Sequence, residues 1–94
     1  MTETYKTMFD LNSHKPIIVY PCRWTYAVMG KDEEAIRAAI AMVMLSREHQ
    51  IRLSKESAGA KYRSLHVDTV VQSEADRDEI FHSIRNQPAV SMVL

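Results

Sequence analysis

Hydrophobic residues recur along this chain with two different periods, and the order of those periods limits the folds available to it. Runs in which apolar and polar residues alternate have the period of a β-strand, whereas stretches that repeat their apolar residues every three or four positions have that of an amphipathic helix. The order predicted is strand, helix, strand, strand, helix, strand, with these elements at residues 22–30, 31–50, 50–57, 61–71, 74–87 and 89–94.

This order predicts an α+β fold, the ferredoxin-like βαββαβ two-layer sandwich. Each strand–helix–strand unit should close with a right-handed crossover, and two such units interleave in the split arrangement. The expected sheet is four-stranded and antiparallel, in the order 4-1-3-2, with two helices on one face. The phase of the first strand places Trp24, Tyr26 and Val28 toward the helices. Arg23 and Thr25 then lie on the opposite face, which is left to solvent or to a partner.

Local signals define the ends of several elements. Asp32 is a suitable N-cap for the first helix, and Ser73 followed by Asp76 resembles a capping box with Asp in place of the usual Glu. Residues 58–60, Ala-Gly-Ala, supply the turn of a hairpin, and Pro88 ends the second helix. The residues expected to face the sheet are Ile36, Ala39, Ile40 and Val43 in the first helix and Ile80, Phe81 and Ile84 in the second.

Length and charge limit the function classes. A chain of 94 residues predicts one domain, which we place at residues 21–94 after an irregular N-terminal arm at 1–20. Twelve basic and twelve acidic side chains cancel, which argues against a nucleic-acid partner and against a polybasic membrane anchor. The longest apolar run, 38–45, is too short to span a bilayer, and the lone Cys22 suits a reducing compartment. We expect a soluble cytoplasmic protein.

The polar side of the third strand is the main candidate for a binding surface. Side chains two apart on a strand point the same way, so Ser64, His66 and Asp68 should form one line on the open face. One interpretation is a solvated sheet face, which antiparallel sheets commonly have. The other is a surface for a ligand or partner, which would comprise Arg23, Thr25, Tyr62, Ser64, His66 and Asp68.

Catalysis and metal binding are poorer interpretations of the same residues. Residues two apart on a strand are roughly 7 Å apart, whereas a nucleophile and its base need about 2.6–3.2 Å. Cys22 has no Cys partner, and the four histidines are scattered along the chain at His14, His49, His66 and His82. We therefore predict no catalytic residue, no metal and no cofactor. The open face also lacks the aromatic pairs with which RNA-binding domains of this fold stack bases.

The first helix and the last strand suggest a second kind of surface. Met42, Met44 and Leu45 fall partly off the inward stripe, so the helix is apolar around more than one face. Neighbouring loops and the N-terminal arm could cover these residues, or they could form a self-association surface. The last strand, which includes Val93, carries no charge and is expected at a sheet edge, where it could pair with a second copy.

Three segments of the chain resemble the YbeD-like family of small uncharacterised bacterial proteins. They are YPCRWTYAVMG at 20–30, SAGAKYRSLHV at 57–67 and SMVL at 91–94, and the resemblance covers roughly residues 20 to 94. It implies a ferredoxin-like fold similar to ACT-type regulatory domains, which bind small molecules such as amino acids, and it implies no known reaction. The chain departs from the family at Ala60, where a turn glycine is usual, and in its longer leader.

These observations lead to one function hypothesis and one alternative. The first is a non-enzymatic regulatory or ligand-binding module of unknown ligand, acting alone or as a homodimer. The alternative is an interaction adaptor that docks on another protein through the first helix or the last strand. An enzyme is the weakest interpretation, because no catalytic constellation is present in the sequence pattern.

Overall fold

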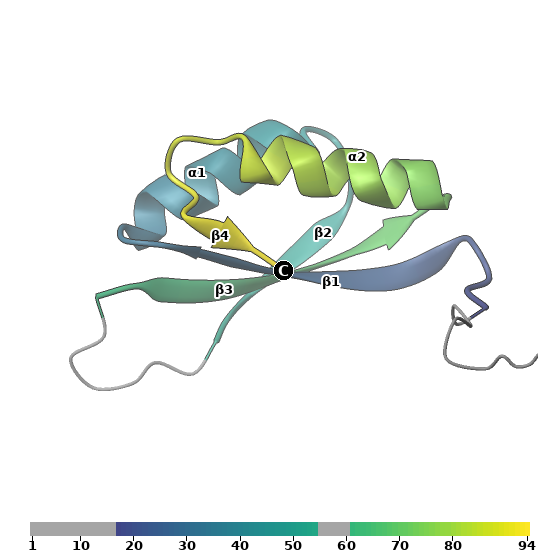
Figure 1. The fold of residues 1–94 in the computed structure, drawn as a ribbon, viewed down its shortest axis with the longest axis horizontal. Helices are drawn as coiled ribbons and strands as arrows, with labels where there is room; N and C mark the ends of the chain where they lie inside the picture. The colour runs from purple at the N-terminus through teal and green to yellow at the C-terminus, as the bar shows by residue number, and fades with distance from the viewer. Residues whose placement is uncertain (1–16, 55–60) are drawn as a thin grey trace, which may run out of the picture.

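The computed structural model describes residues 17–54 and 61–94, and it has the predicted order of strands and helices (Figure 1). Both helices lie on one side of the sheet, so the α+β two-layer architecture is confirmed. The six elements are β1 (Cys22–Gly30), α1 (Glu33–Met44), β2 (His49–Leu53), β3 (Arg63–Val71), α2 (Glu74–Arg85) and β4 (Met92–Val93).

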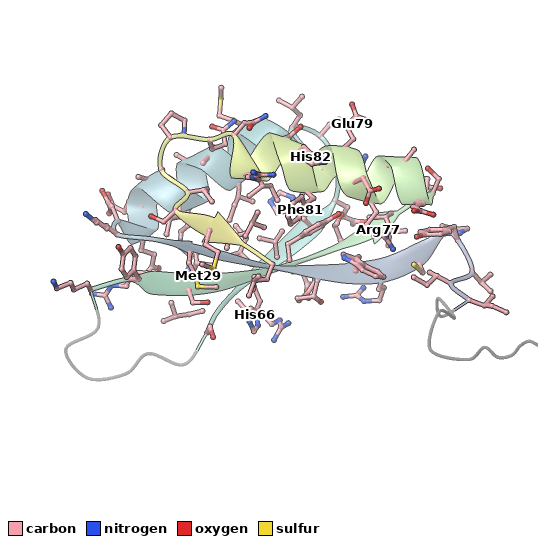
Figure 2. The ribbon with its side chains drawn as sticks, in the orientation of Figure 1. Met29, His66, Arg77, Glu79, Phe81 and His82 are labelled. Carbon is pink, nitrogen blue, oxygen red and sulfur yellow. The ribbon has the colours of Figure 1, made fainter. Side chains whose placement is uncertain are left out.

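The sheet is antiparallel throughout, in the order β2-β3-β1-β4, which is the predicted order 4-1-3-2 written from the other edge. Its centre is the long pairing of β1 with β3, which runs from Cys22 opposite Val71 to Gly30 opposite Arg63. Figure 2 shows Phe81 on the helix side of the sheet and His66 on the other side. We call this second side the open face.

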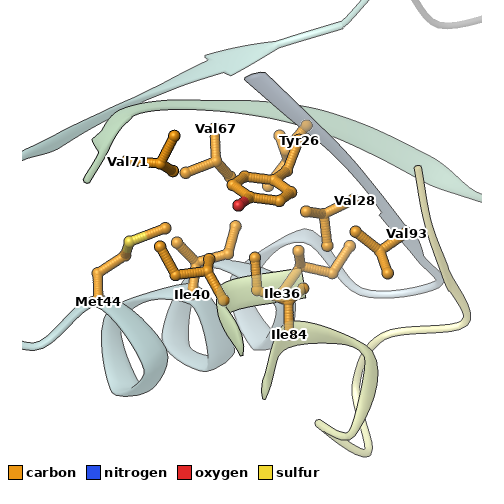
Figure 3. Close-up of a cluster of buried hydrophobic side chains, with 11 residues drawn as sticks. Tyr26, Val28, Ile36, Ile40, Met44, Val67, Val71, Ile84 and Val93 are labelled. Carbon is orange, nitrogen blue, oxygen red and sulfur yellow. The ribbon is translucent and has the colours of Figure 1, made fainter. Parts of the chain in front are cut away.

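A single hydrophobic core fills the space between the helices and the sheet (Figure 3). Tyr26 and Val28 are fully buried in it and Trp24 packs against its rim, so the predicted phase of β1 is confirmed. The core comprises Tyr26, Val28, Ile36, Ile40, Met44, Leu65, Val67, Val71, Ile80, Ile84 and Val93.

Two residues predicted to serve self-association belong to this core instead. Met44 and Val93 are almost completely buried within the single chain, so neither side chain is available to a second copy, while pairing through the main chain of the edge strand β4 stays a prediction. Met44 points inward because it follows Ile40 by four positions on the same side of α1, and the predicted inward residue Val43 is only partly buried. Met42 and Leu45 are exposed, as a self-association surface would require.

The end of α1 lies earlier than predicted. The helix stops at Met44, and Leu45 takes a left-handed φ of 53° while its N–H donates to the carbonyl of Ala41. Conformations with positive φ end helices, but glycine normally occupies them. The residues after Leu45 lead directly into β2, which starts at His49 rather than at 50.

The bounds of the strands β2 and β4 also differ from prediction. β4 is only Met92–Val93, because a turn in which Val90 N–H donates to the Gln87 carbonyl occupies the preceding residues. β2 is described to Leu53, and the predicted turn at 58–60 lies outside the described residues. Of the predicted arm, only residues 17–20 are described, and they form no strand.

Both predicted helix caps are present. Asp32 accepts a hydrogen bond from Glu34 N–H at 3.1 Å, and Ser73 Oγ accepts one from Asp76 N–H at 3.0 Å. In a capping box the second side chain accepts a hydrogen bond from the N–H of the N-cap residue. Here Asp76 accepts instead from the N–H of Gln72, one residue before Ser73. Within the described residues, neither helix is long and apolar enough to cross a membrane.

Candidate functional site

The pairing of β1, β2 and β3 brings polar side chains together on the open face. Residues directly opposite on antiparallel strands share a face, so the register defines which side chains are neighbours. Asp68 lies between Thr25 on β1 and Gln50 on β2, and His66 lies between Ala27 and Arg52. The open face therefore comprises Arg23, Thr25, Ala27 and Met29 of β1, Gln50 and Arg52 of β2, and Ser64, His66, Asp68 and Val70 of β3.

Asp68 is the centre of a hydrogen-bonded network on this face. Thr25 Oγ1 donates to its Oδ1 at 2.6 Å. Arg52 binds it in a bidentate manner, with Nε donating to Oδ2 at 2.6 Å and Nη2 donating to Oδ1 at 3.1 Å. The hydrogen bonds from Arg52 and Thr25 lower the pKa of the Asp68 carboxyl to about 2, although burial acts in the opposite direction. At neutral pH the network holds a carboxylate whose charge is neutralised by Arg52.

This geometry limits the chemistry of Asp68. A general base works best when its pKa lies near the operating pH, and a carboxyl group with a pKa of about 2 is a weak proton acceptor. Both of its oxygens are already engaged by Thr25 and Arg52. Asp68 is therefore suited to fixing the positions of these two side chains.

The structure gathers some of the predicted surface residues and separates others. Arg23, Thr25 and Asp68 lie close together, and Arg23 contributes to lowering the pKa of Asp68. Ser64 lies farther along β3, opposite Met29, and Tyr62 precedes β3 as an exposed residue. Within the described chain, no hydrogen bond joins Ser64, His66 and Asp68 into a relay, so the row is a line of separate side chains.

A hollow of about 560 Å³ opens beside this network, at the end of the sheet where β2 begins and β3 ends. Its volume is within the usual range of small-molecule sites, about 300–1,000 Å³. The predicted residues Arg23 and Asp68 line it, together with Val70 on β3. The lining also includes residues that sequence reasoning left out of the site, among them Arg47, Glu48, Gln50 and Gln72.

Arg47 fixes one wall of the hollow. Its Nη2 donates to Asp76 Oδ1 at 2.8 Å, and its Nη1 donates to Asp76 Oδ2 at 3.1 Å and to the Val70 carbonyl at 3.0 Å. The hydrogen bond from Gln72 N–H and those from Arg47 lower the pKa of the Asp76 carboxyl. His49 Nδ1 lies 2.9 Å from the Arg47 carbonyl, and because a carbonyl only accepts, this ring nitrogen is the donor. The start of β2 is thereby attached to the end of β3 and to α2.

The aromatic side chains of β1 belong to the helix side and are covered there. The Arg77 guanidinium lies 4.7 Å above the Trp24 ring and donates to the Tyr20 hydroxyl at 3.0 Å. The Tyr26 hydroxyl donates to the Arg77 carbonyl at 2.7 Å, and burial raises its pKa to about 12. Trp24 and Tyr26 are therefore not a platform on which bases could stack.

Metal ligands are not grouped in the part of the chain that the structure describes. Over residues 17–54 and 61–94, no three His, Cys, Asp or Glu side chains come close enough to hold a metal ion. Cys22, the thiol at the start of β1, is half-buried and free.

Solved structures share this arrangement of helices and strands. The Helicobacter pylori protein HP0495 matches with a TM-score of 0.73 and 29% identity, over 88% of this chain and 91% of that one. The ACT domain of a GTP pyrophosphokinase from Chlorobium tepidum matches with a TM-score of 0.56 and 14% identity, over 77% of this chain and 94% of the domain. At that identity the second likeness concerns the fold alone, and it agrees with the expected similarity to ACT-type domains.

Sequence comparison gives the family. An uncharacterised protein of H. pylori strain J99 is 32% identical over 80 residues, which is 85% of this chain and 93% of the relative. A further uncharacterised protein, Cj0253 of Campylobacter jejuni, is 30% identical over 71 residues, or 76% of this chain and 82% of the relative. The family described as "Protein of unknown function (DUF493)" matches residues 15–94, in agreement with the expectation of a family of small proteins without an assigned function. The chain belongs to the DUF493 family.

Proposed function

We propose that this protein is a small, non-enzymatic regulatory module that binds a ligand on the open face of its sheet. The observation that carries the proposal is the polar hollow beside the network of Thr25, Arg52 and Asp68, on the face that the helices leave uncovered. The likeness to an ACT domain supports a regulatory role by analogy of fold.

The electrostatics of the site favour binding over catalysis. Asp68 and Asp76 have lowered pKa values because each accepts several hydrogen bonds, so both are ionised and engaged at neutral pH. Such groups hold a surface in one shape, which reduces the entropy lost when a ligand binds. They do not supply the proton transfer that a hydrolase or isomerase needs.

A thermal-shift screen against amino acids, nucleotides and common cofactors tests the proposal. A ligand that binds only the folded state stabilises it by about 2.7 kcal/mol at a concentration a hundredfold above Kd, so a hit raises the melting temperature. A Val70→Trp variant fills the hollow, because Val70 is an exposed residue of its lining, and should abolish the shift. The matched control is Met42→Trp on the exposed side of α1, which should retain it.

Two results would contradict the proposal. The first is the absence of a shift across the whole library. The second is a shift that Val70→Trp leaves unchanged, which would place the ligand elsewhere on the molecule.

An adaptor or self-associating module is the second candidate, and one observation favours it. Met42 of α1 and Leu45, which directly follows the helix, are 67% and 79% exposed, so most of their apolar surface is not covered within the described chain. If α1 mediates association, light scattering should give a mass above that of the monomer, and Met42→Glu should restore the monomer mass. A monomer mass at all concentrations would contradict self-association.

A further inference from the structure

Four charged side chains line the hollow, and only two of them are neutralised. Arg47 is paired with Asp76, and Asp68 is paired with Arg52. The remaining two are Arg23 and Glu48. Over the described residues, neither of these two side chains makes an ion pair or a hydrogen bond. The hollow therefore presents one positive and one negative group without a direct ion-pair partner, although the charge of Arg23 also acts on Asp68 at longer range.

The sheet register places these two charges on opposite sides of Val70. Arg23 lies directly across from Val70 on β1. Glu48 immediately precedes His49, which pairs with Thr69, so its position is beside Val70 on the other flank of β3. Two strand spacings, roughly 10 Å, separate the main chains of the two residues. Both side chains can reach inward from these positions, and the amide side chains of Gln50 and Gln72 lie in the same lining.

We infer that the hollow binds a small zwitterion, with Arg23 binding its anionic group and Glu48 binding its cationic group. This inference rests on the proposed ligand-binding function and specifies the class of its ligand. A ligand with only a negative charge would be attracted by Arg23 but repelled by Glu48. A ligand with only a positive charge would be attracted by Glu48 but repelled by Arg23. A molecule that carries both charges a few ångström apart can bind both exposed groups at once.

A charge-spacing series tests the inference with defined probes. The probes are glycine, β-alanine, 4-aminobutyrate and 6-aminohexanoate, which separate the same two groups by increasing distances, together with the standard amino acids. Propionate and propylamine serve as single-charge controls. We expect at least one zwitterion to raise the melting temperature and to bind in calorimetry at concentrations at which neither single-charge control does.

Neutralising variants identify the two binding groups. Arg23→Gln and Glu48→Gln should each weaken Kd for that zwitterion about tenfold or more, the effect of losing one charge-assisted hydrogen bond. The matched controls are Arg85→Gln and Glu79→Gln, which make the same charge changes at exposed positions of α2 and should leave Kd unchanged.

An internal salt bridge between Arg23 and Glu48 is the competing explanation, and a double-mutant cycle on the unliganded protein separates the two. If the charges are free, the changes in stability from Arg23→Gln and Glu48→Gln add. A clear coupling between them would show that they pair with each other, and this would overturn the inference.

The binding data can also overturn it independently of the proposed function. If no zwitterion binds, or if binding is indifferent to Glu48→Gln, the ligand class is wrong. Should another compound still bind in a manner that Val70→Trp abolishes, the ligand-binding function stands with a different ligand. If nothing binds, both fail.

Discussion

At the scale of single residues, Asp68 holds the open face together. It joins β1 to β2 through side chains, because Thr25 and Arg52 donate to it from either side of β3. Its side chain is 10% exposed whereas that of Arg52 is 55% exposed, so water screens the pair from one side. We therefore assign it a modest contribution to stability and a larger one to the shape of the surface.

Asp68→Asn should lower the free energy of unfolding by about 1 kcal/mol at pH 7, because the neutral amide loses the ionic bond to Arg52. The pKa of Asp68 is depressed from 3.8 to about 2 on folding. Its contribution is therefore complete above pH 4 to 5 and is lost as the pH falls through about 2. Urea unfolding from pH 7 to pH 2 should show the two curves converging in acid.

The control for this comparison is Asp78→Asn, since Asp78 is an exposed carboxylate on α2 with one weak contact to Arg77 at 3.4 Å. It should change stability by less than about 0.5 kcal/mol. A difference between wild type and Asp68→Asn that persists unchanged at pH 2 would contradict the assigned role of the carboxylate.

Gly30 is a second residue whose substitution should change stability, because there is no room for a Cβ atom at this position. A Cβ there would overlap the carbonyl oxygen of Ala89 and meet the Ile36 side chain at 3.0 Å. Gly30→Ala should therefore destabilise the protein by about 1–3 kcal/mol through overpacking. Thermal unfolding measures the effect, and an unchanged melting temperature would show that the segment around Ala89 moves aside without cost.

Single residues also show which parts of the candidate site could be predicted from the sequence and which could not. The side of the sheet on which Arg23, Thr25 and Asp68 lie follows from alternation alone, and it was predicted. Their partner Arg52 and the lining residues Arg47 and Gln72 were left out of the predicted site. Which residue of β2 lies beside Asp68 depends on the register, and Arg47 reaches Asp76 across 29 positions. No local pattern encodes contacts of this kind.

At the scale of the elements, the starts of the two helices are better determined by the sequence than their ends. Asp32 and Ser73 mark where the helices begin, because a capping side chain bonds to N–H groups only two or three residues away. The end of α1 was misplaced because Leu45, and not a glycine, takes the positive φ. β4 begins later than predicted because Gln87–Val90 forms a turn with Pro88 at its second position, which proline favours, whereas the prediction starts the strand directly after Pro88.

Leu45→Gly should stabilise the protein by about 1 kcal/mol. The backbone of Leu45 has φ 53° and ψ −118°, which glycine adopts without the steric cost that a Cβ imposes. Little packing is lost, because the side chain is largely exposed. Chemical denaturation of the pure variant measures the change.

The matched control is Met42→Gly, an equally exposed apolar residue inside α1 with helical backbone. It should destabilise by about 1 kcal/mol, since glycine is unfavourable in a helix interior. Loss of stability in both variants would mean that the Leu45 side chain contributes more through packing than its backbone conformation costs.

At the scale of the whole molecule, the fold divides the sheet into a closed and an open face. The helices bury the apolar residues of β1 and β3 on one face, and this requires the polar residues of the same strands to lie together on the other. The two-layer fold was predictable because strand order and helix period constrain it jointly. The hollow was not, since it forms where the α1–β2 connection meets the end of β3, and residues far apart in the sequence make that contact.

The most direct measurement is a titration followed by amide chemical shifts, with the compound that most raises the melting temperature. We predict that the largest chemical-shift changes map to the hollow, at Arg23, Glu48, Gln50 and Val70, and that the shifts of residues on the outer faces of α1 and α2 stay unchanged. Chemical-shift changes that are concentrated on the helices, with none at residues of the open face, would contradict ligand binding at the hollow.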